Sequence, residues 1–264
     1  MIGVAAHGAP ARARRELRAA AAAVCFLTRL PLGRALTVDG DDLARAGSAF
    51  PLVGTAVGAS IGAVALLLVH PLGAWLAAVL ALAAGTLLTG ALHLDGLADS
   101  ADALSARSRE RALELMRDHA IGSYGGAALV LDLLLKAGAL TALAAKGDVL
   151  RVAVVAGALS RAAPVLLAAA LPYARTDAGL GTSLTQGGRG RAAVAVVLAA
   201  GIAVAVAGAG DGAVSAAAAA AVTALVGLGC RRRFRGVTGD TLGATVELSE
   251  IAVLLTAVGM LGAR

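Results

Sequence analysis

Three regularly spaced aspartates mark the first stretch of the chain that could do chemistry. Asp95, Asp99 and Asp102 lie at i, i+4 and i+7 in LHLDGLADSADAL, so a helix would place all three on one face. A carboxylate at mid-bilayer costs about 2.5–3.5 kcal/mol, so we expect them at the edge of an apolar layer, facing water or cations. Mg²⁺ prefers such oxygen ligands and is typically held by a few carboxylates together with substrate phosphates. The alternative is a solvated helix start, where the helix dipole favours acidic residues.

A second acidic group lies near the C-terminus, in GDTLGATVELSE. Asp240 and Glu247 are seven residues apart and Glu250 follows three residues later, so these side chains could also share one helix face. Two carboxylate groups at one membrane face are harder to explain as helix caps than either group alone. They predict a cavity that holds one or two divalent ions, with these metal ligands: Asp95, Asp99, Asp102, Asp240 and Glu247.

Basic and glycine-rich residues between the two acidic groups suit a phosphate. Arg117 precedes His119 in MRDHAIGSYGG, and arginine's planar fork matches phosphate oxygens. A glycine-rich turn that opens a helix can present backbone N–H groups to an anion, which here involves Gly122, Gly125 and Gly126. His119 could act as a base near neutral pH, as histidine side chains often do. The arginines could instead belong to a solvated amphipathic helix.

Asp132, Lys136 and Arg161 each fall inside an apolar run. Asp132 and Lys136 are spaced i, i+4, which predicts a mutually compensating pair. Arg161 has no acidic residue within its own run. It therefore needs an acidic partner from another helix or an anionic substrate group, and we favour a functional role for it.

The elements that must position these residues are membrane-spanning helices. Of the 264 residues, 59% are hydrophobic and 2% aromatic, above the roughly 45–50% apolar content of soluble domains. The basic residues lie in short stretches without interleaved aromatics, which argues against nucleic-acid binding. We expect one all-α membrane domain over 1–264, with a basic amphipathic segment at 1–24. Runs of about 20 apolar residues predict seven spans: Phe50–Val69, Leu72–Leu92, Tyr124–Ala145, Val149–Leu171, Ala192–Gly208, Ala213–Cys230 and Thr245–Ala263.

The basic residues also predict how the chain is oriented. Most of the 23 lysines and arginines fall before the first span, between 95 and 121, between 172 and 191, or at 231–235. With seven spans, these four regions lie on one side, which the positive-inside rule makes cytoplasmic. We therefore expect a cytoplasmic N-terminus, an outside C-terminus and both acidic groups at the cytoplasmic face.

An ordered set of motifs resembles the cobalamin synthase family, the adenosylcobinamide-GDP ribazoletransferases. The matching stretches cover almost the whole chain beyond its first dozen residues: FLTRLPLG, FPLVG, LHLDGLADSADAL, RSRERALELMRDHAIGSYGG, SRAAP and GDTLGATVELSE. The resemblance implies a Mg²⁺-dependent, multi-pass enzyme of the bacterial cytoplasmic membrane. It would join adenosylcobinamide-GDP to α-ribazole or α-ribazole 5′-phosphate and release GMP. Membrane lipid is an expected partner, and the chain could also form homo-oligomers or associate with other corrinoid-assembly enzymes.

Phosphoryl transfer of this kind needs charge neutralisation and in-line positioning. On this interpretation the five acidic ligands hold metal, while Arg117, Arg161 and the 122–126 turn bind phosphate oxygens. Asp99 or His119 takes the proton of the attacking hydroxyl.

Two other functions remain open at this point. A CDP-alcohol phosphotransferase also places aspartates at a membrane face, but DGLADSADAL has Asp99 where that pattern has an arginine, and its spacing is shorter. A polytopic transporter could use Asp132, Lys136 and Arg161 as intramembrane coupling groups, and would place charges near mid-membrane in two corresponding halves.

Overall fold

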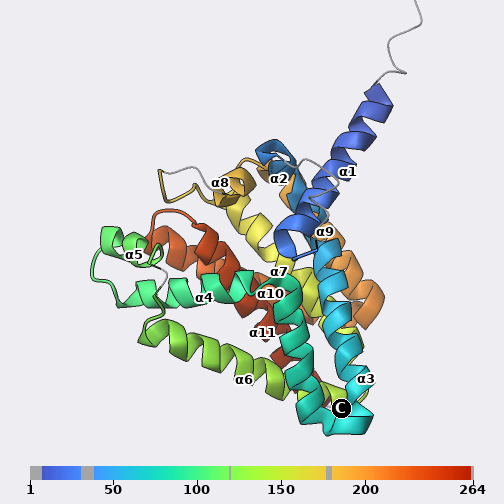
Figure 1. The fold of residues 1–264 in the computed structure, drawn as a ribbon. Coiled ribbons are helices and arrows are strands. Elements are labelled where there is room, and N and C mark those ends of the chain that lie inside the picture. Colours follow the sequence, from blue (N-terminus) through green and yellow to red (C-terminus); the bar gives the residue numbers. More distant parts are fainter. Residues whose placement is uncertain (1–7, 31–38, 119, 177–179, 263–264) are drawn as a thin grey trace, which may run out of the picture.

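The computed structural model describes residues 8–30, 39–118, 120–176 and 180–262. Within these ranges the chain forms helices joined by turns and loops and no strand, which confirms the predicted all-α fold (Figure 1). Short 3₁₀ turns at Gly47–Ala49 and Ala103–Ser105 adjoin the helices. The helices are α1 (Gly8–Leu27), α2 (Gly40–Ala46), α3 (Phe50–Thr89), α4 (Leu92–Asp102), α5 (Arg109–Leu115), α6 (Ser123–Ala145), α7 (Val149–Ala170), α8 (Leu180–Thr185), α9 (Gly188–Ala207), α10 (Ala209–Arg233) and α11 (Gly239–Gly262).

Helix α3 is a hairpin of two arms. The chain leaves helical geometry at Gly73, where φ is 78° and ψ is 162°, a conformation that glycine adopts without a side-chain clash. The arms then pack together, since a Cβ on Gly85 would come within 2.7 Å of Ile61 (Figure 1). The predicted turn at His70-Pro71 is therefore present, with its sharp bend two residues later.

Six described helices are long and apolar enough to cross a membrane: α3, α6, α7, α9, α10 and α11. Because α3 contains two arms, the predicted seven spans each correspond to a helical segment of the structure. Large apolar side chains such as Leu67 and Leu87 are more than 70% exposed on the outside of the bundle, as expected for surfaces that face lipid. The chain is a polytopic membrane bundle.

Three predicted helix starts differ from the structure by four residues or more. Helix α9 starts at Gly188, four residues before the predicted Ala192. Helix α10 starts at Ala209, directly after Gly208, and not at the predicted Ala213. Helix α11 starts at Gly239, six residues before the predicted Thr245. The hydroxyl of Thr238 accepts a hydrogen bond from the backbone N–H of Thr241 at 3.1 Å, which caps this helix start. The GDTLG motif therefore forms the first turn of α11.

Helix α7 lies at the centre of the bundle. In the most apolar stretch of α7, 83% of the residues are buried, against 22% in the corresponding stretches of α9 and α10. Small residues allow α3 to approach it closely: any Cβ on Gly54 or Gly58 would collide with the backbone of α7. The polar residues on α7 therefore face other helices and not lipid.

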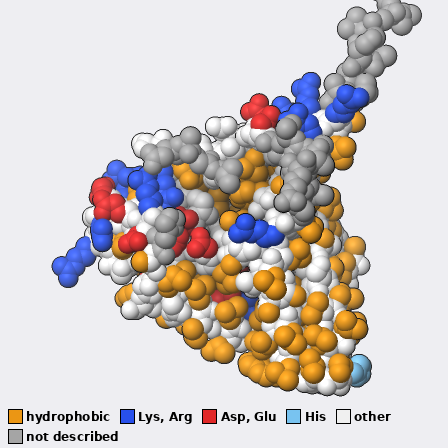
Figure 2. Space-filling view, viewed as in Figure 1, with side chains coloured by type: hydrophobic (Ala, Val, Ile, Leu, Met, Phe, Trp, Pro, Cys, Tyr) orange, Lys and Arg blue, Asp and Glu red, His pale blue; other side chains and the backbone are white. Residues whose placement is uncertain are grey.

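Charged side chains gather at one end of the molecule. Figure 2 shows lysine, arginine, aspartate and glutamate in its upper part and hydrophobic side chains over the lower part. Helix α1 is tied to this end by ion pairs, from Arg18 to Asp42 at 2.6 Å and from Glu16 to Arg191 at 3.0 Å. Its buried face contains alanines and Leu27. Helix α1 is thus basic on one side and apolar on the other, as predicted for the N-terminal segment.

Candidate functional site

Helix α4 carries the aspartate row. Helix α3 ends at Thr89. The next two residues, Gly90 (φ 65°) and Ala91 (φ 59°), are both left-handed, so the chain turns sharply before α4 begins. Helix α4 then packs on α11, and a Cβ on Gly96 would lie 2.7 Å from the carbonyl oxygen of Asp240. Asp95, Asp99 and Asp102 lie on this one helix, as their spacing predicts.

The close packing of α4 on α11 brings the two acidic groups to one cavity. This mouth cavity has a volume of about 300 Å³ and is lined by Asp95 and His93 of α4, Asp240 and Gly243 of α11, and Phe50, Tyr173 and Arg175. Asp95 is exposed and Asp240 is half-buried. Asp95 and Asp240 therefore line the same cavity.

Arg175 is a cavity residue that sequence reasoning missed. One of its terminal nitrogens lies 2.6 Å from the carboxylate of Asp240. Its Nε is buried and has no hydrogen-bond partner in the described part of the chain, which leaves a donor available to an anion in the cavity. The sequence offered one weak signal, a lone arginine in a short loop after an apolar run.

Arg109 holds the loop that carries Arg175. Its Nε donates to the carbonyl of Phe234 and a terminal nitrogen donates to the carbonyl of Ala174, both at 2.8 Å. The isolated bridge between Tyr173 and Val237 links the same two loops. The α7–α8 loop and the start of α11 are therefore fixed together on one side of the mouth cavity.

Asp102 binds the glycine turn of its own chain. Its carboxylate accepts hydrogen bonds from the backbone N–H groups of Gly122 at 2.7 Å and Gly125 at 2.8 Å. A side chain on Gly125 would collide with this carboxylate, and Gly126 N–H donates to the carbonyl of Gly122. The predicted anion-binding turn is thus present at the start of α6, and the anion that it holds is Asp102.

Two predicted site residues lie near the α5–α6 connection. Arg117 is exposed directly after α5, and it does not line the mouth cavity. His119 lies outside the described residues.

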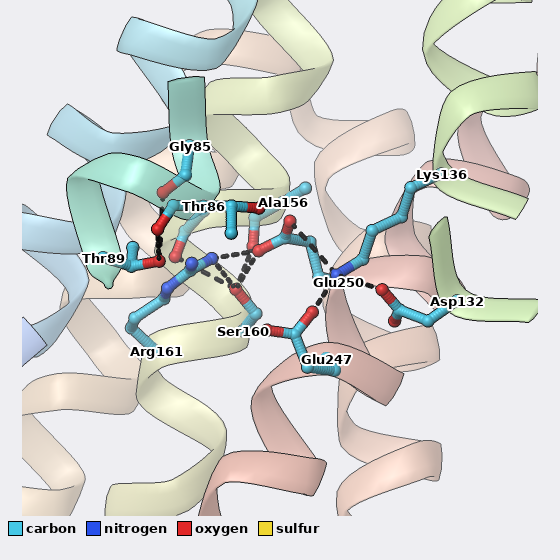
Figure 3. Close-up of polar contacts among 11 residues, drawn as sticks. Gly85, Thr86, Thr89, Asp132, Lys136, Ala156, Ser160, Arg161, Glu247 and Glu250 are labelled. Atoms are coloured by element: carbon cyan, nitrogen blue, oxygen red, sulfur yellow. Dashed lines mark hydrogen bonds and ion pairs between the residues drawn. The ribbon is translucent and has the colours of Figure 1, made fainter. Parts of the chain in front are cut away.

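Five charged residues form a buried ion network inside the bundle (Figure 3). Its members are Asp132 and Lys136 of α6, Arg161 of α7, and Glu247 and Glu250 of α11. Each is at least 93% buried. The ammonium of Lys136 lies 3.2 Å from Asp132, which confirms the predicted pair, and also contacts Glu247.

Arg161 completes the ion network from the other side. It contacts Glu250 and donates to the hydroxyl of Ser160 at 2.8 Å. This is the acidic partner from another helix that the sequence required. The guanidinium is thereby compensated within the protein, so the structure does not place Arg161 in the mouth cavity.

Glu247 does not lie with the aspartate row. It belongs to the ion network, because α11 starts at Gly239 and residue 247 is about 10 Å further along the axis than Asp240. Asp240 and Glu247 could share a face of α11 and still lie at different depths in the bundle. Among the described residues, no group of three or more acidic, histidine or cysteine side chains is arranged to hold a metal ion. The five predicted ligands are therefore not brought together as one group.

His93 links the mouth cavity to the ion network. It lines the cavity and is buried. Burial, and next the charge of Arg161, lower the pKa of His93 to about 3. The side chain is therefore neutral at physiological pH.

Comparison with known proteins identifies the family. Residues 19–258 match the family described as cobalamin-5-phosphate synthase. The chain belongs to this family. Relatives from Escherichia coli O45:K1, Escherichia coli K12 and Shigella flexneri serotype 5b are each 39% identical over 239 residues, which is 89% of this chain and 96% of theirs. Each is named adenosylcobinamide-GDP ribazoletransferase. No solved structure matches the chain.

Membership of the cobalamin-5-phosphate synthase family confirms the resemblance based on the ordered motifs. The motifs occupy the elements described above: LHLDGLADSAD forms α4 and GDTLGATVELSE forms the first half of α11. In this chain the motif residues divide between the mouth cavity, the cap of α6 and the ion network.

Proposed function

We propose that the chain joins adenosylcobinamide-GDP to α-ribazole or α-ribazole 5′-phosphate, giving adenosylcobalamin or its 5′-phosphate and GMP. The family match and the shared name of the relatives support this activity. A hydroxyl of the ribazole ribose attacks the phosphate attached to cobinamide. The bond from that phosphate to the bridging oxygen breaks, and GMP leaves with this oxygen.

The observation that carries the proposal is the mouth cavity, where two carboxylates and an arginine with an unpaired donor converge. Its volume of about 300 Å³ suits part of a nucleotide more than a whole corrinoid. Arg175 would bind phosphate oxygens through Nε and a terminal nitrogen, the side-on geometry that guanidinium favours. The corrin ring would then lie outside the cavity.

The donor set of the mouth cavity fits Mg²⁺. Mg²⁺ is usually bound by one or two carboxylates plus substrate phosphates, and Asp95 and Asp240 supply two carboxylates to one cavity. These two residues would hold it, with Asp99 one turn further along α4. When bound, the ion supplies charge neutralisation at the diphosphate.

Residues of the chain would then orient and deprotonate the nucleophile. Asp99 is half-buried on the same helix as Asp95, and we propose its carboxylate as the base that takes the hydroxyl proton. Tyr173 and Phe50 line the cavity and offer surfaces for a base or ribose. Asp102 is occupied by the cap of α6, so we assign it a structural role.

The charged end of the bundle is proposed as the cytoplasmic face. Lysine and arginine side chains gather at this end in Figure 2, and the elements that form the mouth cavity lie at this end in Figure 1. Substrates and GMP would then exchange with the cytoplasm at the inner membrane.

The test uses purified protein in lipid nanodiscs, with GMP release and corrinoid product measured against Mg²⁺ concentration. We expect Asp95→Asn and Asp240→Asn to lower kcat at least about 100-fold, since each removes charge opposite the diphosphate. Arg175→Ala should raise the KM for adenosylcobinamide-GDP about 10- to 100-fold, the equivalent of one charged hydrogen bond.

Asp148→Asn is the matched control for these variants. Asp148 pairs with Arg151 at 3.0 Å and lies at the turn between α6 and α7, away from the mouth cavity. Its activity should equal that of the unchanged protein. Full activity in both Asp95→Asn and Asp240→Asn, or GMP release that does not need ribazole, would contradict the proposal.

A further inference from the structure

The ion network lies apart from the mouth cavity. None of its five members lines that cavity; together they line a separate space of about 30 Å³ deeper in the bundle. The mechanism above therefore gives them no chemical task. They nevertheless join three helices through contacts that are almost fully buried (Figure 3).

Stability does not explain the ion network. It contains three carboxylates and two cations, and no oxygen of Asp132 has a hydrogen-bond partner in the described part of the chain, although Lys136 lies 3.2 Å away. Removing charges from water costs several kcal/mol per ion, and apolar residues of similar size often stabilise a protein as well or better. A buried network of this kind is best explained by a geometric role.

The geometry of the contacts points to helix α11. Glu247 contacts Lys136 of α6, and Glu250 contacts Arg161 of α7. The two glutamates are three residues apart, so they project from nearly the same side of α11 at depths about 4.5 Å apart. These contacts with two different helices oppose both sliding and rotation of α11.

Asp240 lies on the same helix, seven residues before Glu247. A slip of α11 by one residue would move Asp240 by about 1.5 Å along the axis and about 100° around it. At the mouth cavity α11 packs on α4 through Gly96 and Gly243. These residues have no side chains to interlock. The loop contacts before Gly239 hold only the start of α11, and the ion network holds the helix about two turns further along its axis.

We propose that the ion network is a positioning device that sets the register of α11, and thereby the placement of Asp240 opposite Asp95. Lys136 and Arg161 act through Glu247 and Glu250, and they touch no substrate. The consequence for metal binding rests on the proposed function, whereas the register of α11 does not.

The test replaces the central pair without leaving a buried charge unpaired. A single Lys136→Met variant would leave the buried carboxylates without their cation and would be strongly destabilised. The double variant Lys136→Met/Glu247→Met is therefore used, with Asp132→Asn added to remove the third charge. We expect this triple variant to fold with an equal or higher melting temperature. If it does not fold, Lys136→Gln/Glu247→Gln/Asp132→Asn carries the same test.

Two readouts follow α11 and the cavity separately. Spin labels on cysteines replacing the exposed Leu131 of α6 and Leu255 of α11 report the distance between the helices, in a background of Cys25→Ala and Cys230→Ala. Mn²⁺ binding, measured by electron paramagnetic resonance, reports the cavity. We expect a shifted or broadened distance distribution and about 10-fold weaker Mn²⁺ binding.

Arg151→Met is the matched control. Arg151 is also a cation of α7 paired with aspartates, Asp148 at 3.0 Å and Asp211 at 3.7 Å, but it lies ten residues from Arg161 at the start of the helix. Both readouts should stay unchanged in this variant.

The outcomes separate this inference from the proposed function. An unchanged distance distribution in the folded triple variant overturns the positioning role, and so does a shifted distribution with unchanged Mn²⁺ binding. A shifted distribution together with weaker Mn²⁺ binding supports the positioning role. If the unchanged protein shows no ribazole transfer, that result contradicts only the proposed function.

Discussion

Arg175 has two properties of an anion-binding side chain: it lines a cavity, and its buried Nε has no hydrogen-bond partner among the residues that the structure describes. Its contact with Asp240 at 2.6 Å also offsets the repulsion that Asp240 feels from Asp95. The guanidinium therefore supplies a positive charge beside Asp240 in the mouth cavity. With substrate bound, a divalent ion would neutralise the acidic groups, and the guanidinium would bind substrate phosphate.

The lowered pKa of His93 predicts how the stability of the protein depends on pH. Its pKa falls from the ordinary 6.5 to about 3 on folding, so between these values the unfolded chain binds a proton that the folded chain does not. Its contribution to stability is complete above pH 6.5 and is lost as pH falls toward 3. We expect His93→Gln, which stays neutral, to lose less stability than the unchanged protein over this range.

Thermal unfolding in detergent from pH 7.5 to 4 measures the effect. Other titrating groups are common to both proteins, so the difference between the two curves isolates His93. Parallel curves would show that the histidine is protonated as easily in the folded chain as in the unfolded one.

At the scale of elements, Asp102 joins α4 to α6. The N-terminal N–H groups of α6 need acceptors, and Asp102 supplies them with a full negative charge near the positive end of the helix dipole. The aspartate row is therefore divided: Asp95 faces the mouth cavity, while Asp102 secures the next span.

Asp102→Ala should destabilise the protein by about 1–2 kcal/mol, the usual cost of a lost helix cap. Mn²⁺ affinity should stay within about twofold of the unchanged protein, because Asp95 and Asp240 remain. Asp118→Ala is the control, since Asp118 accepts a hydrogen bond from Ala120 in an exposed turn. Weaker Mn²⁺ binding with unchanged stability would instead make Asp102 a metal ligand.

At the scale of the whole molecule, the uneven charge distribution is the basis of the proposed orientation in the membrane. Helix α6 runs from the charged end toward the turn at Lys146, and its 23 residues give about 34 Å, enough to cross a hydrocarbon layer of about 30 Å. The two ends of α6 therefore lie on opposite sides of the membrane.

Cysteine labelling tests the proposed orientation. Arg232→Cys and Lys146→Cys both place a thiol at an exposed position, in a background of Cys25→Ala and Cys230→Ala. In intact cells a membrane-impermeant maleimide should label only Lys146→Cys, and in inside-out vesicles only Arg232→Cys. The reverse pattern would put the mouth cavity outside the cytoplasm.

Much of this architecture could be predicted from sequence, because it depends on local properties. Apolar runs of about 20 residues located the spans to within a few residues, and α6 and α7 match the predicted starts and ends within one residue. Spacing along one helix predicted the aspartate row and the Asp132–Lys136 pair. The ordered motifs predicted the family.

The tertiary structure decided how these residues are shared among sites. Whether Glu247 meets Asp95 or Lys136 depends on the depth at which α11 packs against α6, and helical periodicity carries no information about depth. The same holds for Arg175, whose role depends on two loops brought together by Arg109. Sequence determined the helices and their polar faces because those follow from neighbouring residues. Only packing between distant segments could select each charged side chain's partner.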